Sequence, residues 1–113
     1  MSNIMNNKNK VKYPSQYVVL GQYSVLQGDY DKAVDLYRKA LEKMPCNRKV
    51  LYFLANAYFR KAVNDKTDKA RSYRNAFCNY EKIIRSEPEG PISNMARKKM
   101  AELRKEVDID LGE

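Results

Sequence analysis

The feature that most constrains the fold of this 113-residue chain is a helical apolar pattern that occurs twice, each time as a pair of segments closed by a proline. In the first pair, Pro14 opens the first segment, Gly28 ends it and Pro45 ends the second. Pro88 closes the second pair. Small residues recur where two paired helices would approach most closely, and they are Gly21, Ala33, Ala40, Ala55 and Ala76. No segment alternates apolar and polar residues, so we predict an all-α chain of helical pairs without strands.

A fifth helical segment follows the two pairs. It opens at Gly90-Pro91 and carries apolar residues at helical spacing through Val107. Its opposite face is basic and consists of Arg97, Lys98, Lys99, Arg104 and Lys105. Residues 1–13 are polar and rich in Asn and Lys, so we expect a disordered basic arm there, and we expect a short tail over residues 108–113.

The two pairs resemble the tetratricopeptide repeat (TPR), a helix–turn–helix unit of about 34 residues. The first copy departs from the repeat pattern at Ser24, and the second has Ala55 where Gly is usual. The matching positions are Tyr17, Leu20-Gly21, Gly28-Asp29-Tyr30, Ala33, Tyr37, Ala40 and Pro45 in the first copy, and Leu51, Leu54, Tyr58, Ala76, Tyr80, Ile83 and Pro88 in the second. The resemblance implies a right-handed α-solenoid fragment.

That solenoid fragment would be a single domain over residues 14–107. It would consist of repeat one (14–47), repeat two (48–90) and a C-terminal capping helix (91–107). The second copy is longer than the family's repeat by about nine residues, and the register places them between Arg60 and Arg71. This stretch, residues 61–70, is polar. We interpret it as a solvated, mobile turn, and the alternative is that it extends both helices by about one turn each.

The composition excludes several kinds of chemistry. The chain contains no His, which excludes Ser-His-Asp and Cys-His nucleophile systems and His-ligated zinc. Its two cysteines, Cys46 and Cys78, are far apart in the sequence and cannot form a structural zinc site alone. We interpret them as reduced thiols, and the alternative is a single disulfide between them. No acid–base pair lies in an apolar setting, so we expect no enzyme activity, no metal and no cofactor.

The family resemblance implies a protein-binding module, an adaptor or assembly factor, whose concave groove holds a partner peptide or helix. Mapped onto this chain, the groove would consist of Val18, Gln22, Tyr52, Asn56 and Phe59, with Lys49 and Lys99 at its rim. Family members that clamp a C-terminal carboxylate carry a fixed set of Lys, Asn and Arg residues, of which only Asn56 is identical here, so we do not expect a strict clamp. The alternative for Tyr52 and Phe59 is packing against the capping helix or a neighbouring subunit.

The net charge of +8 suggests an acidic partner. The basic residues form three separate clusters and follow no single recognition helix, so nucleic acid is the least favoured partner. An anionic membrane surface and a solvated face are further alternatives. The clusters are Lys8, Lys10 and Lys12 in the arm, then Arg60, Lys61, Lys66, Lys69, Arg71 and Arg74, and then Arg97, Lys98, Lys99, Arg104 and Lys105. The first helical pair has no repeat before it, so we also expect self-association as a homodimer or a tight partner complex.

No apolar run reaches the length of about 18 residues that a membrane-spanning helix needs. Because we interpret both cysteines as reduced, which favours a reducing compartment, we expect a cytoplasmic protein. A second resemblance gives the alternative. The charged stretch from Asn64 to Lys69 and the order of the later positions are similar to periplasmic TPR lipoproteins of the outer-membrane β-barrel assembly machinery; those positions are Ala70, Ala76, Tyr80, Ile83-Ile84, Pro88, Ala96 and Leu103. Such a protein would be periplasmic if an upstream signal peptide had been removed.

Overall fold

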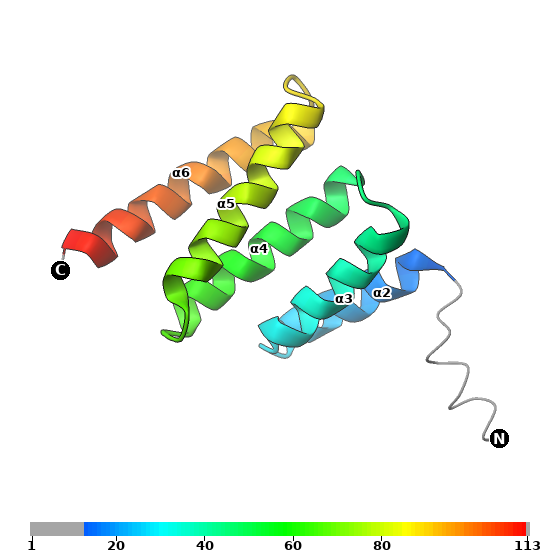
Figure 1. Cartoon of the computed structure of the whole chain (residues 1–113), viewed down its shortest axis with the longest axis horizontal. Helices are drawn as coiled ribbons and strands as arrows, with labels where there is room; N and C mark the ends of the chain where they lie inside the picture. Colours follow the sequence, from blue (N-terminus) through cyan, green and yellow to red (C-terminus); the bar gives the residue numbers. More distant parts are fainter. Residues whose placement is uncertain (1–12, 113) are drawn as a thin grey trace.

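The computed structural model describes residues 13–112, so the predicted basic arm lies, apart from Tyr13, outside the described residues. The described part of the chain is all-α, as predicted, with five helices that pack on one another in sequence order (Figure 1). The helices are α2 (Pro14–Leu26), α3 (Tyr30–Lys43), α4 (Arg48–Asn64), α5 (Lys69–Ser86) and α6 (Pro91–Gly112). Helix α4 lies in the middle of the molecule, with α2 and α3 on one side of it and α5 and α6 on the other.

Local sequence signals explain where the helices of the first pair begin and end. Pro14 occupies the first turn of α2, where its missing N–H costs nothing. Gly28 has a φ of 78°, the left-handed conformation that glycine adopts without a steric penalty. The Asp29 carboxylate then accepts a hydrogen bond from the backbone N–H of Lys32 (3.1 Å) and caps α3.

The small residues bring the helices together as the sequence suggested. A Cβ atom on Gly21 of α2 would lie 2.5 Å from Cε1 of Tyr37 on α3, so this glycine is required for the close contact of the first pair. Ala33, Ala40, Ala55 and Ala76 are all completely buried. These contacts fix the spacing between neighbouring helices and leave larger side chains to fill the two cores.

Two apolar cores lie on opposite sides of α4. The first joins α2, α3 and α4, and its buried residues are Ala33, Val34, Tyr37, Ala40, Val50, Leu54 and Ala57. The second joins α4, α5 and α6, and its buried residues are Leu51, Ala55, Phe59, Ala62, Tyr73, Ala76, Tyr80, Ile83, Ala96, Met100 and Leu103. The larger second core holds α6 in place, which agrees with its expected role as a cap.

The prediction of a solvated turn over residues 61–70 is wrong in most of its length. Helices α4 and α5 have 17 and 18 residues, against 13 and 14 for α2 and α3, so each is longer by about one turn. Only residues 65–68 connect them. The reason is apolar contact beyond the usual repeat length, because Ala62 is completely buried and the rings of Phe59 and Tyr73 lie 6.5 Å apart.

The first turn of α5 has no side-chain cap. Asp68 occupies the N-cap position, but its backbone is left-handed, with a φ of 54°, and its side chain does not accept a capping hydrogen bond. The turn is stabilised instead by the Asp65 carboxylate, which accepts a hydrogen bond from the Thr67 N–H (2.9 Å). This bond lowers the pKa of Asp65.

Helix α6 continues beyond residue 107 through Gly112, where a tail was expected. The Tyr73 hydroxyl donates a hydrogen bond to Asp110 (2.8 Å), and Lys69 forms an ion pair with the same carboxylate (3.2 Å). Both partners lie on the first turns of α5, so the end of α6 is tied to the added turn of α5. The hydrogen bond from Tyr73 and the contact with Lys69 lower the pKa of Asp110.

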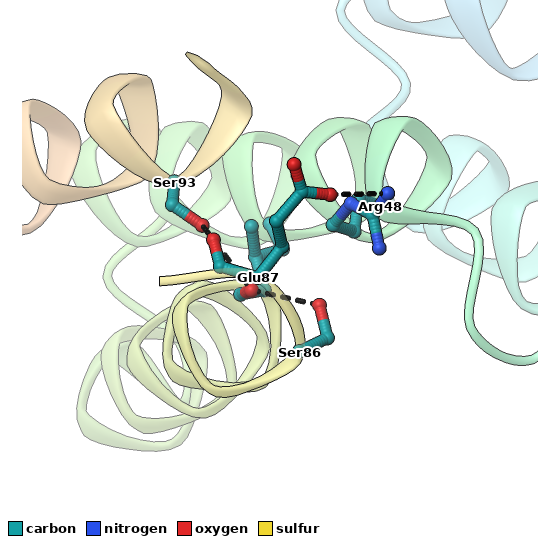
Figure 2. A network of polar contacts seen from close by, with 5 residues as sticks. Arg48, Ser86, Glu87 and Ser93 are labelled. Atoms are coloured by element: carbon teal, nitrogen blue, oxygen red, sulfur yellow. Dashed lines mark hydrogen bonds and ion pairs between the residues drawn. The ribbon is translucent and has the colours of Figure 1, made fainter. Parts of the chain in front are cut away.

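The turn between α5 and α6 is held by a polar network (Figure 2). Ser93, which is completely buried, has its hydroxyl within hydrogen-bonding distance of the carbonyl oxygens of Ile83 (3.3 Å) and Glu87 (2.5 Å). The Ser86 hydroxyl donates to the same Ile83 carbonyl (2.8 Å). The Glu87 carboxylate pairs with Arg48 at the start of α4 (2.5 Å). The network therefore connects three helices at one end of the second core.

Candidate protein-binding groove

A cavity of about 600 Å³ opens between α2, α4 and α6, and we call it the groove. Ten residues line it: Gln22, Val25 and Leu26 from α2, Tyr37 from α3, Phe53, Asn56, Ala57, Phe59 and Arg60 from α4, and Lys99 from α6. The groove thus spans both repeats and the last helix, with α4 as its floor. The groove exists because the helices pack in sequence order and α2 and α6 both contact α4.

One side of the groove is apolar. Val25 and Leu26 come from the last turn of α2, and Phe53 comes from α4, where its ring stacks against Tyr37 (5.9 Å between centroids). Leu26 is 82% exposed, the most exposed large apolar side chain among the described residues. The groove can therefore bury apolar side chains of a ligand without any rearrangement of the core.

Asn56 supplies the central polar group of the groove, and its orientation is set by Tyr80. The Tyr80 hydroxyl donates a hydrogen bond to Oδ1 of Asn56. Burial raises the pKa of Tyr80 well above its usual range, so the hydroxyl remains a donor under all ordinary conditions. Because Oδ1 already accepts this bond, the amide NH₂ of Asn56 is the group left to meet a ligand, and it requires an acceptor.

The charged residues of the groove are both basic. Arg60 lies with its guanidinium 5.3 Å from the centroid of the Tyr30 ring, and Lys99 lies 3.5 Å from Glu102 on the same helix. The lining residues include no acid. The groove therefore combines an apolar wall with positive charge and an amide donor.

The structure brings together four of the seven residues predicted for the groove, namely Gln22, Asn56, Phe59 and Lys99. The other three do not line it. Val18 is half-buried against the first core, and Tyr52 packs into the second core with its ring 6.1 Å from that of Tyr80. Lys49 is exposed near the start of α4. The ring contact of Tyr52 is thus with α5, which is neither the groove nor the capping helix or neighbouring subunit named in the alternative.

Phe59 combines a structural contact with its place in the groove. Its side chain is only 8% exposed and contacts Tyr73 in the second core. The sequence reasoning missed Leu26, Phe53, Tyr37 and Arg60 as lining residues. Leu26 and Arg60 lie four residues after the predicted groove residues Gln22 and Asn56, so helical spacing was the signal that could have found them.

Several residues of the predicted basic clusters are engaged within the chain. Lys61 forms an ion pair with Asp31 of α3 (2.5 Å), and this contact raises the pKa of Lys61. Arg97 donates hydrogen bonds to the Pro88 carbonyl (2.7 Å) and to Asn94 (3.1 Å). Arg104 lies over the Phe77 ring, 5.5 Å from its centroid. Each of these basic residues is therefore held by a different partner at a different place in the fold.

Residues 13–112 contain no helix long and apolar enough to cross a membrane. They also contain no group of three Cys, Asp or Glu side chains arranged to hold a metal ion.

Residues 24–73, which run from the end of α2 to the start of α5, match the family model of the tetratricopeptide repeat. They form a tetratricopeptide repeat region. TPR modules generally mediate protein–protein interaction and are typically not catalytic. The helical repeat expected from the sequence is thereby confirmed, with α3 and α4 entirely inside the matched residues.

Two curated proteins are similar to part of the chain. BBSome complex member BBS4 of Mus musculus is 41% identical over 49 residues, which is 43% of this chain and 9% of that protein. The Bos taurus protein of the same name is 38% identical over 50 residues, or 44% of this chain and 10% of that protein. The chain thus matches about a tenth of the length of these relatives. The resemblance to periplasmic lipoproteins receives no support from these matches.

Proposed function

We propose that this chain is a non-catalytic protein-binding module, an adaptor or assembly factor, that holds a helix or peptide of a partner protein in the groove. The observation that carries the proposal is the lining of the groove. Apolar side chains from α2 and α4 face a cavity whose charged residues, Arg60 and Lys99, are both basic. TPR modules generally bind other proteins, and the groove is where this chain offers shape, apolar surface and polar donors together.

The chemistry of the groove specifies the kind of segment it would take. The Asn56 amide NH₂ and the two bases all require acceptors, so the segment carries Asp or Glu and presents backbone carbonyls. The wall formed by Val25, Leu26 and Phe53 requires large apolar side chains on the same segment. The partner is therefore an acidic and apolar segment, which also agrees with the net charge of +8.

Two further observations bear on the setting of this function. The relatives are named as members of a complex, and a role in a protein assembly fits a binding module of this kind. Cys46 and Cys78 are both exposed free thiols, a state that persists in reducing compartments, so we place the protein in the cytoplasm. The periplasmic alternative would require an oxidising environment around both thiols.

The test uses synthetic helical peptides that carry Leu and Phe together with Asp or Glu, and matched peptides with Lys in the acidic positions. Binding is measured by fluorescence anisotropy. We expect the acidic peptides to bind and the Lys peptides to bind at least about tenfold more weakly. Asn56→Asp is the sharpest variant, because the carboxylate still accepts the bond from Tyr80 but replaces the donor NH₂ with an acceptor. This variant should bind the acidic peptide at least about tenfold more weakly than the parent protein does.

A matched pair on α6 separates the groove from general charge. Lys99 lines the groove, whereas Lys98 is an exposed neighbour outside it. Lys99→Glu should slow association of the acidic peptide and reduce its salt dependence, and Lys98→Glu should change both much less. Equal effects of the two variants, together with normal binding by Asn56→Asp, would move the binding surface away from the groove.

A further inference from the structure

Helix α2 exposes an unusually apolar face. Val19, Leu20, Tyr23 and Leu26 on α2, with Tyr13 just before it, have exposed fractions between 48% and 82%. We call these five residues the α2 face. Helix α2 packs on α3 and touches α4 through its other side, where Gly21 and Ser24 are buried. A helix that is apolar on all sides is normally covered on all sides, but no described element covers this face.

The size of the α2 face is large for an isolated surface. Two tyrosines and three aliphatic side chains, each about half exposed or more, leave on the order of several hundred Å² of exposed surface, much of it apolar. Each partner of a standard interface buries roughly 800 Å², so these five side chains would supply a large part of such an interface and their neighbours would supply the rest.

The distribution of charge indicates which partner can use this face. Residues 14–26 contain no charged side chain, and the whole first pair, residues 13–44, balances four basic residues with four acidic ones. The surplus of positive charge therefore lies in the other parts of the chain. Two copies that each carry +8 repel one another through most of their surfaces, whereas a contact between two α2 helices brings together residues 14–26, which carry no charge.

We propose that the α2 faces of two copies of this chain pair with each other in an antiparallel, twofold-symmetric dimer. Val19, Tyr23 and Leu26 follow one another at steps of four and three residues, so an antiparallel pairing sets Tyr23 near its own counterpart and Val19 opposite Leu26 of the second copy. This arrangement also opposes the two helix dipoles favourably. Leu26 belongs to both the α2 face and the groove, so the variants that test the dimer are placed at Val19 and Tyr23, which do not line the groove.

A head-to-tail contact between α2 of one copy and α6 of the next does not fit the charges. The side of α6 opposite its buried residues carries Lys98, Glu102 and Lys105, all exposed. Pairing this side with the α2 face would remove those charges from water without partners on α2. The symmetric contact avoids this penalty, because both halves of the interface are uncharged.

Light scattering at about 100 µM protein tests the proposal. We expect the mass of two 13.2 kDa chains for the parent and of one chain for the double variant Val19→Lys with Tyr23→Lys. The matched control is Met95→Lys with Ile109→Lys, which changes two exposed apolar residues of α6 and should leave the dimer intact. Circular dichroism checks that each variant keeps its helices. A parent protein that has the mass of one chain at this concentration overturns the proposal.

Two further measurements test whether the partner on the α2 face is a second copy of this chain that uses the same face. The variant Val19→Glu with Tyr23→Glu should also be monomeric, and mixing it with the Lys variant should restore a one-to-one dimer. In a chain with Cys46→Ser and Cys78→Ser, Tyr23→Cys should form a disulfide-linked dimer under mild oxidation much faster than Met95→Cys. Equal rates, or a Lys variant that remains dimeric, would show that the copies meet elsewhere. The monomeric Lys variant is also tested for binding of the acidic peptide, which shows whether the groove functions without the dimer.

Discussion

The two ends of the molecule are closed in different ways. At one end, α6 buries Ala96, Met100 and Leu103 in the second core and presents a charged opposite side to water. At the other end, α2 fully buries only Gly21 and Ser24, packs Tyr17, Val18 and Val25 half-buried against the first core, and exposes large apolar side chains on its outer side. Both are terminal helices of the same described array, but α6 is amphipathic in the way a cap must be and α2 is not.

The difference shows that position at the end of a helical array does not by itself make a cap. A helix closes an array when its outer side is polar enough to face water at no cost. Helix α6 meets this condition, and its contact with the first turns of α5 through Asp110 adds a second attachment. Helix α2 contributes one wall of the groove and leaves its other side for a further contact.

The largest test of this comparison uses the same substitution at both ends. Leu103→Ala removes a nearly buried side chain from beneath α6 and should lower the free energy of unfolding by about 2–5 kcal/mol. Leu26→Ala removes an exposed side chain from α2 and should change it by less than about 0.5 kcal/mol. Urea unfolding at high dilution, where the chain is monomeric, measures both. Similar losses at the two ends would mean that α2 is covered in the monomer.

A smaller effect is expected from the close contact inside the first pair. Gly21→Leu forces a side chain against the Tyr37 ring, which is itself almost fully buried, and should cost about 1–3 kcal/mol. Gln22→Leu is the matched control, because it places the same leucine one residue later at an exposed position. A Gly21→Leu protein that melts like the parent would show that α2 and α3 do not pack through this glycine.

The smallest effect is one of pH and involves both cores. Burial raises the pKa of Tyr37 to about 12, and burial together with Asp110 raises the pKa of Tyr73 to about 12. Since each folded-state pKa lies above the ordinary tyrosine value of 10.0, the contribution of these two hydroxyls to stability is complete below about pH 10 and is lost as the pH rises toward about 12. Tyr37→Phe should reduce this alkaline loss, measured as the urea midpoint between about pH 9 and about pH 12.

The comparison of Tyr37→Phe with the parent at about pH 7 serves as the control, since the hydroxyl is protonated in both states there. An alkaline loss that stays the same in Tyr37→Phe and in Tyr73→Phe would contradict the assignment to these two hydroxyls. A reduction in Tyr73→Phe alone would place the alkaline weakness in the second core, next to α6.

The sequence alone was sufficient for the all-α class and for the order of the helices. Pro14, Gly28, Asp29 and Pro88 act on the backbone within one or two turns, so their effects do not depend on distant residues. Gly21 also followed from the repeat pattern, because a position of closest approach tolerates no larger side chain. The sequence could therefore indicate which helices pair.

Only the tertiary structure decided which side chains share the groove and how long the central helices are. Tyr52 and Phe59 both lie on α4 and both contact a tyrosine of α5, but only Phe59 also lines the groove. The polar stretch after Arg60 is helical through Asn64 because Ala62 finds a buried place in the second core. Both outcomes depend on contacts between residues far apart in the chain, and local spacing carries no information about what lies across from a side chain.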